Sequence, residues 1–443
     1  MLNYITTVKE NNKGGRIWIE GESLRRAGFK PNSRYRLEYR DGEIILSVSK
    51  KGERTVSKRT RSNIVFPIID INNQKILEIF QSDTPVVASL EKRTIRISIH
   101  EIKKLQKHRE NVFFSKLEND IALDESSLFT GGGISTHAIN KGLKKYKIKS
   151  KISSIAEMDP SYLQIAQRNL NPAHCHVAKI EDIQSKDIKG TDILSFSMPC
   201  TGHSNHGKAS NKIKIAEEHS QANTALFGVV NYIVNSNPAI LISENVVQAK
   251  YSATYILLKA EINRLGYDIF EYDLDQNQAG SIEKRKRYWF VAISKGISKV
   301  VNLEKLNIPT YKREHKNIKS ILDERDNEKW MKSDYFNSRL EKNISNNRGF
   351  RTSFVNEDQD SVNVIPRNYT KRQISNPHFI NKEGDKIRLF NPKEHCLIKG
   401  VPFKLLRGVS DTKAHEILGQ SVAYKQAMGI GEIIGELCSL IKN

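Results

Sequence analysis

The stretch Ile193–Ser204 reads ILSFSMPCTGHS, an apolar strand that ends in a loop of small and polar residues. Cys200 lies in this loop, just past the end of the strand, whereas a structural cysteine normally lies within an apolar run. A cysteine at this point can be exposed and activated as a thiolate nucleophile. Cys200 is therefore the first candidate catalytic residue.

Similar strands lie on both sides of this stretch, between about residues 112 and 298. Strands that alternate with helical segments are typical of an α/β domain built on a parallel sheet. The candidate strands are 152–157, 176–180, 193–197, 239–243, 268–274 and 288–293. Because ligands bind at the C-terminal edge of such sheets, residues that follow these strands are the candidate site residues.

Three strand ends carry groups that suit a nucleotide-like ligand. Phe129 opens a turn with Gly131 and Gly133, which can bring the backbone close to a ligand. Glu157 ends the next strand, where an acid can accept hydrogen bonds from ribose hydroxyls. Asp182 follows a third strand, where a carboxylate can accept a bond from an adenine amino group. Each acid alone is more often a helix cap, but together they favour a cofactor pocket.

A further carboxyl group lies next to the strand of Cys200. Glu244 opens the sequence Glu-Asn-Val, directly after an apolar strand. A carboxyl group at this edge can protonate or hydrogen-bond a ring nitrogen. Glu244 is therefore the candidate general acid.

Taken in order, these motifs resemble the DNA cytosine-5 methyltransferase family over roughly residues 125–441. The matching segments are F-x-G-x-G at 129–133, P-C at 199–200, E-N-V at 244–246, a partial Q-x-R-x-R at 283–287, a ninth motif at 388–402 and G-x-S-V at 419–422. The resemblance implies a Rossmann-like, S-adenosylmethionine-dependent methyltransferase sheet. It also implies methyl transfer to C5 of a cytosine in a specific duplex DNA sequence.

The resemblance gives each candidate residue a role. Cys200 would attack C6 of a flipped cytosine, and Glu244 would donate to N3, which requires a raised pKa. Arg285 and Arg287 would hold the base and the loop. The residues implied to bind S-adenosylmethionine are Phe129, Gly131, Gly133, Glu157, Met158, Asp182, Ile183, Pro199, Gln420, Ser421 and Val422.

Some positions depart from the family pattern. Met198 replaces the second proline of P-P-C, Thr201 replaces the following glutamine, and Glu283 replaces the glutamine of Q-x-R-x-R. The strand before Phe129 is unusually polar, with Glu-Ser-Ser at 125–127. These changes leave the nucleophile, the acid and the arginines in place, but they put full-speed turnover in doubt.

Charge and composition favour a polyanionic partner. Lys and Arg number 71 and Asp and Glu 50, a formal charge of +21, and each neutralised phosphate releases a condensed counterion. The resemblance makes this partner double-stranded DNA, contacted by a mobile loop at 201–220 and a target-recognition region at 299–380. Candidate DNA contacts are Ser204, Lys208, Arg348, Arg351, Lys371 and Arg372.

Residues 1–110 form a separate β-rich domain with an internal repeat of about 52 residues. Each unit contains a strand, a short helix and a hairpin. This order resembles the swapped-hairpin DNA-binding fold of AbrB-like and SymE-like proteins, in which two units interlock. A small β-domain that only packs on the enzyme is the alternative.

The expected organisation is 1–110, a catalytic domain at 111–298, target recognition at 299–380 and a C-terminal return to the catalytic domain at 381–443. Four scattered cysteines offer neither metal-site nor disulfide spacing. With no apolar stretch long enough to span a membrane, the expectation is a cytoplasmic, nucleoid-associated prokaryotic monomer. A cognate restriction endonuclease is a candidate partner, although an orphan methylation system fits equally.

Three rival interpretations remain. A tRNA cytosine methyltransferase would share the fold and the basic charge. A DNA-binding regulator would depend on residues 1–110, but the retained Cys200, Glu244 and Asp182 argue against it. A small-molecule methyltransferase would need neither the charge of +21 nor the basic region at 299–380.

Overall fold

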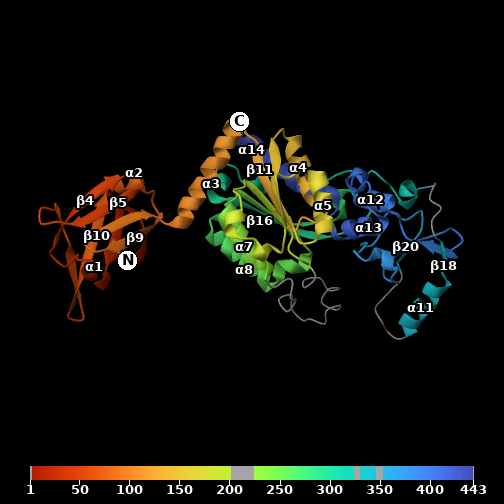
Figure 1. Ribbon diagram of the computed structural model, residues 1–443, viewed down its shortest axis with the longest axis horizontal. Helices are drawn as coiled ribbons and strands as arrows, with labels where there is room; N and C mark the ends of the chain where they lie inside the picture. The colour runs from red at the N-terminus through yellow and green to blue at the C-terminus, as the bar shows by residue number, and fades with distance from the viewer. Residues whose placement is uncertain (1, 201–223, 324–329, 346–352, 443) are drawn as a thin grey trace. The chain divides into compact units, whose positions relative to one another are not determined.

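The computed structural model describes residues 2–200, 224–323, 330–345 and 353–442. The chain divides into two compact units, Met1–His108 and Arg109–Asn443 (Figure 1). Helix α3, Glu101–Glu118, includes the boundary. Among the described residues, none of the helices combines the length and apolarity needed to cross a bilayer.

The first unit contains the predicted repeat. The elements of its halves are β3 Gly14–Glu20, α1 Glu22–Arg26, β4 Arg34–Arg40 and β5 Glu43–Val48, then β8 Ile64–Asn73, α2 Lys75–Ile79, β9 Pro85–Glu91 and β10 Thr94–Ile99. The halves interlock, because β3 pairs with β8 and β5 pairs with β10, both antiparallel. Trp18 lies opposite Asp70, and Ile45 lies opposite Arg96. These are equivalent positions of the two repeats, so an approximate two-fold axis relates the halves.

Four further strands complete the two sheets of this unit: β1 Leu2–Thr7, β2 Lys9–Asn11, β6 Arg54–Thr55 and β7 Ser57–Arg61. The alternating apolar residues of both halves, such as Ile17, Ile44, Ile69 and Ile95, are fully buried in one shared core. Neither half could bury this apolar surface alone, which explains why the two repeats interlock.

The second unit is built on a seven-stranded sheet of order β13-β12-β11-β14-β15-β17-β16. Its strands are β11 Leu123–Leu128, β12 Ser150–Glu157, β13 His174–Val177, β14 Ile193–Phe196, β15 Ile240–Asn245, β16 Tyr267–Leu274 and β17 Arg287–Ser294. β17 runs antiparallel to both β15 and β16. The sheet is therefore mixed, not wholly parallel as expected, because the segment 275–286 turns back beside β16 instead of crossing the sheet.

Helices cover both faces of this sheet (Figure 1). α4 Ile134–Lys145, α5 Pro160–Leu170 and α14 Tyr424–Lys442 lie on one face, and α7 Ala225–Ser236 and α8 Ala253–Arg264 lie on the other. α4 and α14 approach closely at Gly142 and Gly431, where a Cβ atom would meet the backbone of the other helix within 2.3 Å. Ser421 is extended at the end of α13, Asp411–Gln420, so the C-terminal helix α14 begins only at Tyr424.

The polar stretch after residue 298 has a small core and sheet of its own, despite its lack of periodicity. Its four strands are β18 Met331–Lys332, β19 Ser353–Val355, β20 Pro377–Ile380 and β21 Lys386–Arg388, beside α11 Asp334–Ser345. Ile318, Ile365 and Tyr369 are buried at its centre. The sheet continues past residue 380, since β21 ends at Arg388. α12, Pro392–Lys399, packs against this core through Ile398.

The polar strand β11 buries a carboxyl group. Glu125 is 3% exposed, and its Oε1 accepts a hydrogen bond of 2.6 Å from Asn140 Nδ2. Burial raises the pKa of Glu125 to about 7, against the lowering effect of its hydrogen bonds. Because the folded protein binds this proton more tightly than the unfolded chain, the proton stabilises the fold. The contribution is complete at a pH below the pKa of Glu125 in the unfolded chain, and it is lost as the pH rises through about 7.

We expect Glu125→Gln to remove this pH dependence, because a glutamine keeps the shape and the acceptor but cannot ionise. Relative to the variant, the wild type should lose about 3 kcal/mol of unfolding free energy between pH 4.5 and pH 7.5. Melting temperatures of both proteins across this range would measure the change. A difference between them that stays constant with pH would contradict the assignment.

Candidate active site

Cys200 lies at the C-terminal edge of the sheet, where β14 ends. Its loop is held to the neighbouring strand, since Asn245 Nδ2 donates to the carbonyl oxygen of Met198 at 2.9 Å and to Tyr255 Oη at 3.0 Å. Asn245 is 2% exposed, so this bond is shielded from water. The middle residue of the Glu-Asn-Val sequence therefore has a structural role, because Asn245 ties the loop before Cys200 to β15.

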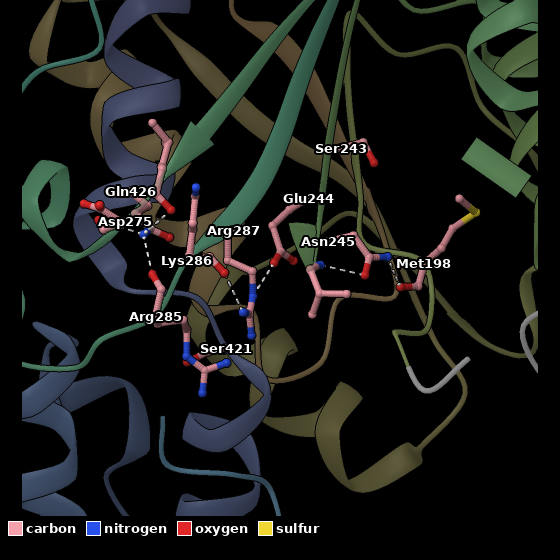
Figure 2. A network of polar contacts seen from close by, with 12 residues as sticks. Met198, Ser243, Glu244, Asn245, Asp275, Arg285, Lys286, Arg287, Ser421 and Gln426 are labelled. Atoms are coloured by element: carbon pink, nitrogen blue, oxygen red, sulfur yellow. Dashed lines mark hydrogen bonds and ion pairs between the residues drawn. The ribbon is translucent and has the colours of Figure 1, made fainter. Parts of the chain in front are cut away.

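Glu244 and Arg287 face each other on adjacent strands at the same edge. Arg287 Nε lies 2.9 Å from Glu244 Oε1, and both side chains are only 12–13% exposed. Figure 2 shows the guanidinium of Arg287 directed at Glu244, and Asn245 directed at Met198 on the other side of β15. The arrangement places a shielded carboxyl–guanidinium pair next to the loop of the candidate nucleophile.

The surroundings shift the proton affinities of these groups. Burial raises the pKa of Glu244, and the charge of Arg287 opposes that shift. This is the direction that a donating Glu244 requires. Cys200 reaches solvent, yet the protein around it is dense enough that desolvation raises the pKa of its thiol, while Arg287 lowers it and Glu244 raises it. The charge of Arg287 is therefore the largest favourable influence on the thiolate, ahead of that of Arg285.

The structure separates the two arginines that the sequence places in one role. Arg285 is 2% exposed, and its guanidinium binds Glu283 with Nε–Oε2 at 2.7 Å. In Figure 2 the guanidinium of Arg285 points away from Glu244, toward Ser421. Arg287 is thus the arginine paired with Glu244, and Arg285 belongs to a buried cluster with Glu283.

The glycine-rich turn has the geometry expected of a ligand loop. Phe129, Gly131 and Gly133 all have positive φ, at 55°, 54° and 79°. A Cβ atom on Gly131 would meet no atom within 4 Å, so a ligand can approach the backbone there. At Gly133 it would lie 3.0 Å from Leu170, so this glycine also permits packing on α5. Glu157 Oε2 accepts a bond of 2.9 Å from the N–H of Gly131 and so supports the turn.

The other candidate cofactor residues differ in exposure. Asp182 follows β13 in the short helix Ile180–Asp182 and is exposed, while Ile183 beside it is 6% exposed. Met158 is 52% exposed at the end of β12, where its thioether is open to contact. Pro199 is half-buried beside Cys200. Phe129, Ser197 and Glu244 line one pocket, which links the glycine-rich turn to the candidate acid.

The C-terminal motif, residues 419–422, is held in place by contacts with nearby side chains and backbone. Gln420 Nε2 donates to Tyr162 Oη at 3.0 Å, and Ser421 Oγ donates to the carbonyl of Leu418 at 2.9 Å. Val422 is 2% exposed and packs in the core. These contacts order the segment but leave the exposed Gln420 accessible from solvent.

Most candidate DNA contacts lie outside the described residues: Ser204, Lys208, Arg348 and Arg351. Lys371 is exposed, whereas Arg372 is partly buried, with φ of 48° and Nη1 2.6 Å from Met331 Sδ. Lys371 therefore remains the more accessible of the two described cations.

Sequence reasoning missed Lys399, which is fully buried with its Nζ 2.8 Å from Glu283 Oε2. In the sequence, Lys399 precedes Gly400 and so resembles an ordinary basic residue at the end of a helix. Only the unusual Glu283 could have indicated that a buried cation is needed to pair with it. The departure at Glu283 is thus compensated within the fold by Arg285 and Lys399.

Comparisons with known proteins place these features in context. The family model for C-5 cytosine-specific DNA methylase matches residues 124–436. The Type II methyltransferase M1.ScrFI of Lactococcus lactis subsp. cremoris is 25% identical over 294 residues, 65% of this chain and 72% of that protein. M.SsoII of Shigella sonnei, also a Type II methyltransferase, is 26% identical over 264 residues, 58% of this chain and 66% of its own length.

Solved structures show the same fold. The Entamoeba histolytica methyltransferase EhMeth superposes with a TM-score of 0.56 at 18% identity, covering 71% of this chain and 98% of its own. The S. pombe Dnmt2 methyltransferase gives a TM-score of 0.52 at 19% identity, with the same coverages. The family match begins at residue 124, so it does not include the first unit.

Proposed function

This chain belongs to the C-5 cytosine-specific DNA methylase family, and from that premise we propose that it methylates C5 of a flipped cytosine with Cys200 as nucleophile and Glu244 as acid. The observation that carries the proposal is the shielded Glu244–Arg287 pair at 2.9 Å, at the sheet edge that also carries Cys200. The relatives among Type II methyltransferases favour a prokaryotic restriction–modification system, with a separate endonuclease as partner, over an orphan enzyme.

In this mechanism the base leaves the duplex at a cost of about a few kcal/mol. The Cys200 thiolate adds to C6, and Glu244 gives a proton to N3, so the electrons of the C5–C6 double bond can act at C5. Arg287 orients Glu244 and favours the thiolate through its charge. After methyl transfer, water takes the proton from C5 and the bond between sulfur and C6 breaks, which restores the double bond and the Cys200 thiolate, while N3 returns its proton to Glu244.

S-adenosylmethionine, when bound, supplies the methyl group from its sulfonium. The residues that fit it are those of the open turn at Gly131, the acids Glu157 and Asp182, and the C-terminal segment with Gln420 and Ser421. Gly131 allows close approach of the ligand, and exposed Asp182 retains free acceptor capacity for an adenine amino group. We assign target recognition to the small sheet after residue 298, with Lys371 and Arg372 as candidate contacts.

Transfer of tritium from labelled S-adenosylmethionine into unmethylated duplex DNA and into tRNA, in parallel, tests this function. We expect label in DNA, recovered as 5-methylcytosine. Label only in tRNA would favour the RNA enzyme, and label in neither, with the cofactor still bound, would favour a regulator.

A basic hairpin in the first unit favours a second role for the chain, a DNA contact outside the catalytic domain. Residues 1–108 of this unit contain 22 Lys and Arg against 12 Asp and Glu. All five residues of β7 are exposed, and β7 pairs with Ile64–Ile68 across a two-residue turn whose residues, Ser62 and Asn63, both have positive φ. Since β3 pairs with β8 only from Ile68 onward, the tip is a two-stranded ribbon.

The ribbon has the positive charge of a DNA-binding element and consists of two strands at its tip. Lys58, Arg59 and Arg61 lie on it, and no acidic residue occurs between Arg54 and Ile69. Glu20 is 3.6 Å from Arg61 and 3.9 Å from Arg59, yet both arginine side chains remain more than half exposed. The major groove of B-DNA admits a two-stranded ribbon of this kind. We therefore propose a second, AbrB-like DNA contact in the first unit.

Replacing Lys58, Arg59 and Arg61 with glutamine should weaken duplex DNA binding and its salt dependence. The slope of log K against log salt should fall by about 0.9 for each phosphate that the variant no longer neutralises. A matched variant with Lys30, Lys75 and Lys92, three exposed cations elsewhere in this unit, changed to glutamine carries the same net charge. Equal slopes for the two variants would mean that only total charge matters, and the ribbon would have no special role.

A further inference from the structure

A buried ionic cluster lies directly before the strand that carries Arg287. Glu283 receives both Nε of Arg285, at 2.7 Å, and Nη2 of Arg285, at 3.0 Å, on its two carboxylate oxygens. Lys399 Nζ, from the end of α12, lies 2.8 Å from Glu283 Oε2. None of the three side chains is more than 2% exposed.

The cluster joins the catalytic sheet to the proposed target-recognition region. The N–H of Ile365 donates to Glu283 Oε1 at 2.9 Å, and Arg285 Nη2 donates to the carbonyl of Ile365 at 3.0 Å. Arg285 Nη2 also donates to the carbonyl of Gly419 at 3.1 Å. The Glu283–Arg285 pair thus forms hydrogen bonds with the backbone at Ile365 and at Gly419, two segments that are distant from it in the sequence.

Lys399 extends the cluster to the C-terminal return. Its Nζ donates to the carbonyl of Ser421 at 2.9 Å, besides its ion pair with Glu283. Gln426, three residues into α14, donates from Nε2 to the carbonyl of Arg285 at 3.1 Å (Figure 2). The backbone on both sides of the cluster is therefore fixed by buried hydrogen bonds.

The charges of the cluster depend on one another. Against the raising effect of burial, Arg285 and Lys399 lower the pKa of Glu283. Burial and Arg285 lower the pKa of Lys399, and Glu283 opposes them. Removing one partner of a buried pair leaves an uncompensated charge, which is far more costly than replacing both partners. Glu283 is therefore the shared partner of both cations: without it Arg285 and Lys399 are both uncompensated, whereas without Lys399 it still pairs with Arg285.

We propose that Glu283 and Lys399 are positioning residues for methyl transfer. Lys399 fixes the carbonyl of Ser421 in the cofactor segment, and Glu283 fixes Arg285, two residues before Arg287. The pair thereby sets the cofactor segment and the Glu244–Arg287 pair in register with the recognition region. This inference rests on the proposed function, because only there does Ser421 belong to the cofactor pocket.

The test compares Lys399→Gln, Glu283→Gln and the double variant with the wild type. The affinity for S-adenosylmethionine is measured by calorimetry and kcat by methyl transfer, both on proteins shown to be folded by circular dichroism. Glu261→Gln is the matched control, because it removes the partner of an exposed arginine, Arg264, on α8. Lys399→Gln should fold, since Glu283 keeps its pair with Arg285.

We expect Lys399→Gln to weaken S-adenosylmethionine binding by about three- to tenfold, the effect of one hydrogen bond, and to lower kcat. Glu283→Gln should be worse, and the double variant should recover part of that loss. Wild-type affinity and kcat in folded Lys399→Gln would overturn the proposal. Absence of methyl transfer by the wild type would refute the proposed function instead, while the affinity series still tests the cluster.

Discussion

Cys200→Ala should reduce methyl transfer to DNA by more than about a thousandfold, because no other group in the proposed mechanism can form the bond to C6. Cys200 is exposed, so its truncation leaves no cavity in the core. The melting temperature and the affinity for duplex DNA should therefore remain those of the wild type. Initial rates of tritium transfer at saturating cofactor would measure the loss.

Two further observations would make this result specific. Cys175→Ala is the matched control, since Cys175 is also partly accessible but lies on β13, and it should retain full turnover. A duplex with 5-fluorocytosine should trap the wild type covalently, because fluorine cannot leave C5 as a cation. Trapping by Cys200→Ala, or turnover within tenfold of the wild type, would rule out Cys200 as the nucleophile.

The features that sequence could predict are those set by local pattern. Cys200 and Glu244 each follow an apolar strand, and parallel strands bring such positions to one edge. The repeat in the first unit was likewise visible, because its strand, helix and hairpin recur at a fixed interval. Local pattern carries this information because each element is specified by its own residues.

The features that sequence could not predict depend on contacts between distant segments. The Q-x-R-x-R spacing predicts one role for Arg285 and Arg287, but Arg285 lies before β17, whereas Arg287 is its first residue, so the two side chains do not share a face of the strand. Arg285 turns to Glu283 and Arg287 to Glu244. Lys399 lies 116 residues from Glu283 in the sequence, so only the fold reveals their pairing.

Glu244→Gln should lower kcat by about a hundredfold to ten-thousandfold, the range for losing a general acid. An amide can still donate a hydrogen bond to N3 but cannot transfer a proton, so the affinity for DNA should change little. Arg287 would also lose its carboxyl partner at 2.9 Å, which removes part of its orientation. Single-turnover rates on preformed complexes with DNA would separate this chemical effect from binding.

The pH dependence gives the sharper test of Glu244. Because burial raises its pKa in the folded protein, the protonated, donating form persists above the usual range of a glutamic acid. Wild-type kcat should fall as pH rises through that folded pKa, and the stability that the bound proton contributes should be lost over the same interval. Glu244→Gln should show neither decline. A variant that keeps the wild-type alkaline limb would show that another group supplies the proton to N3.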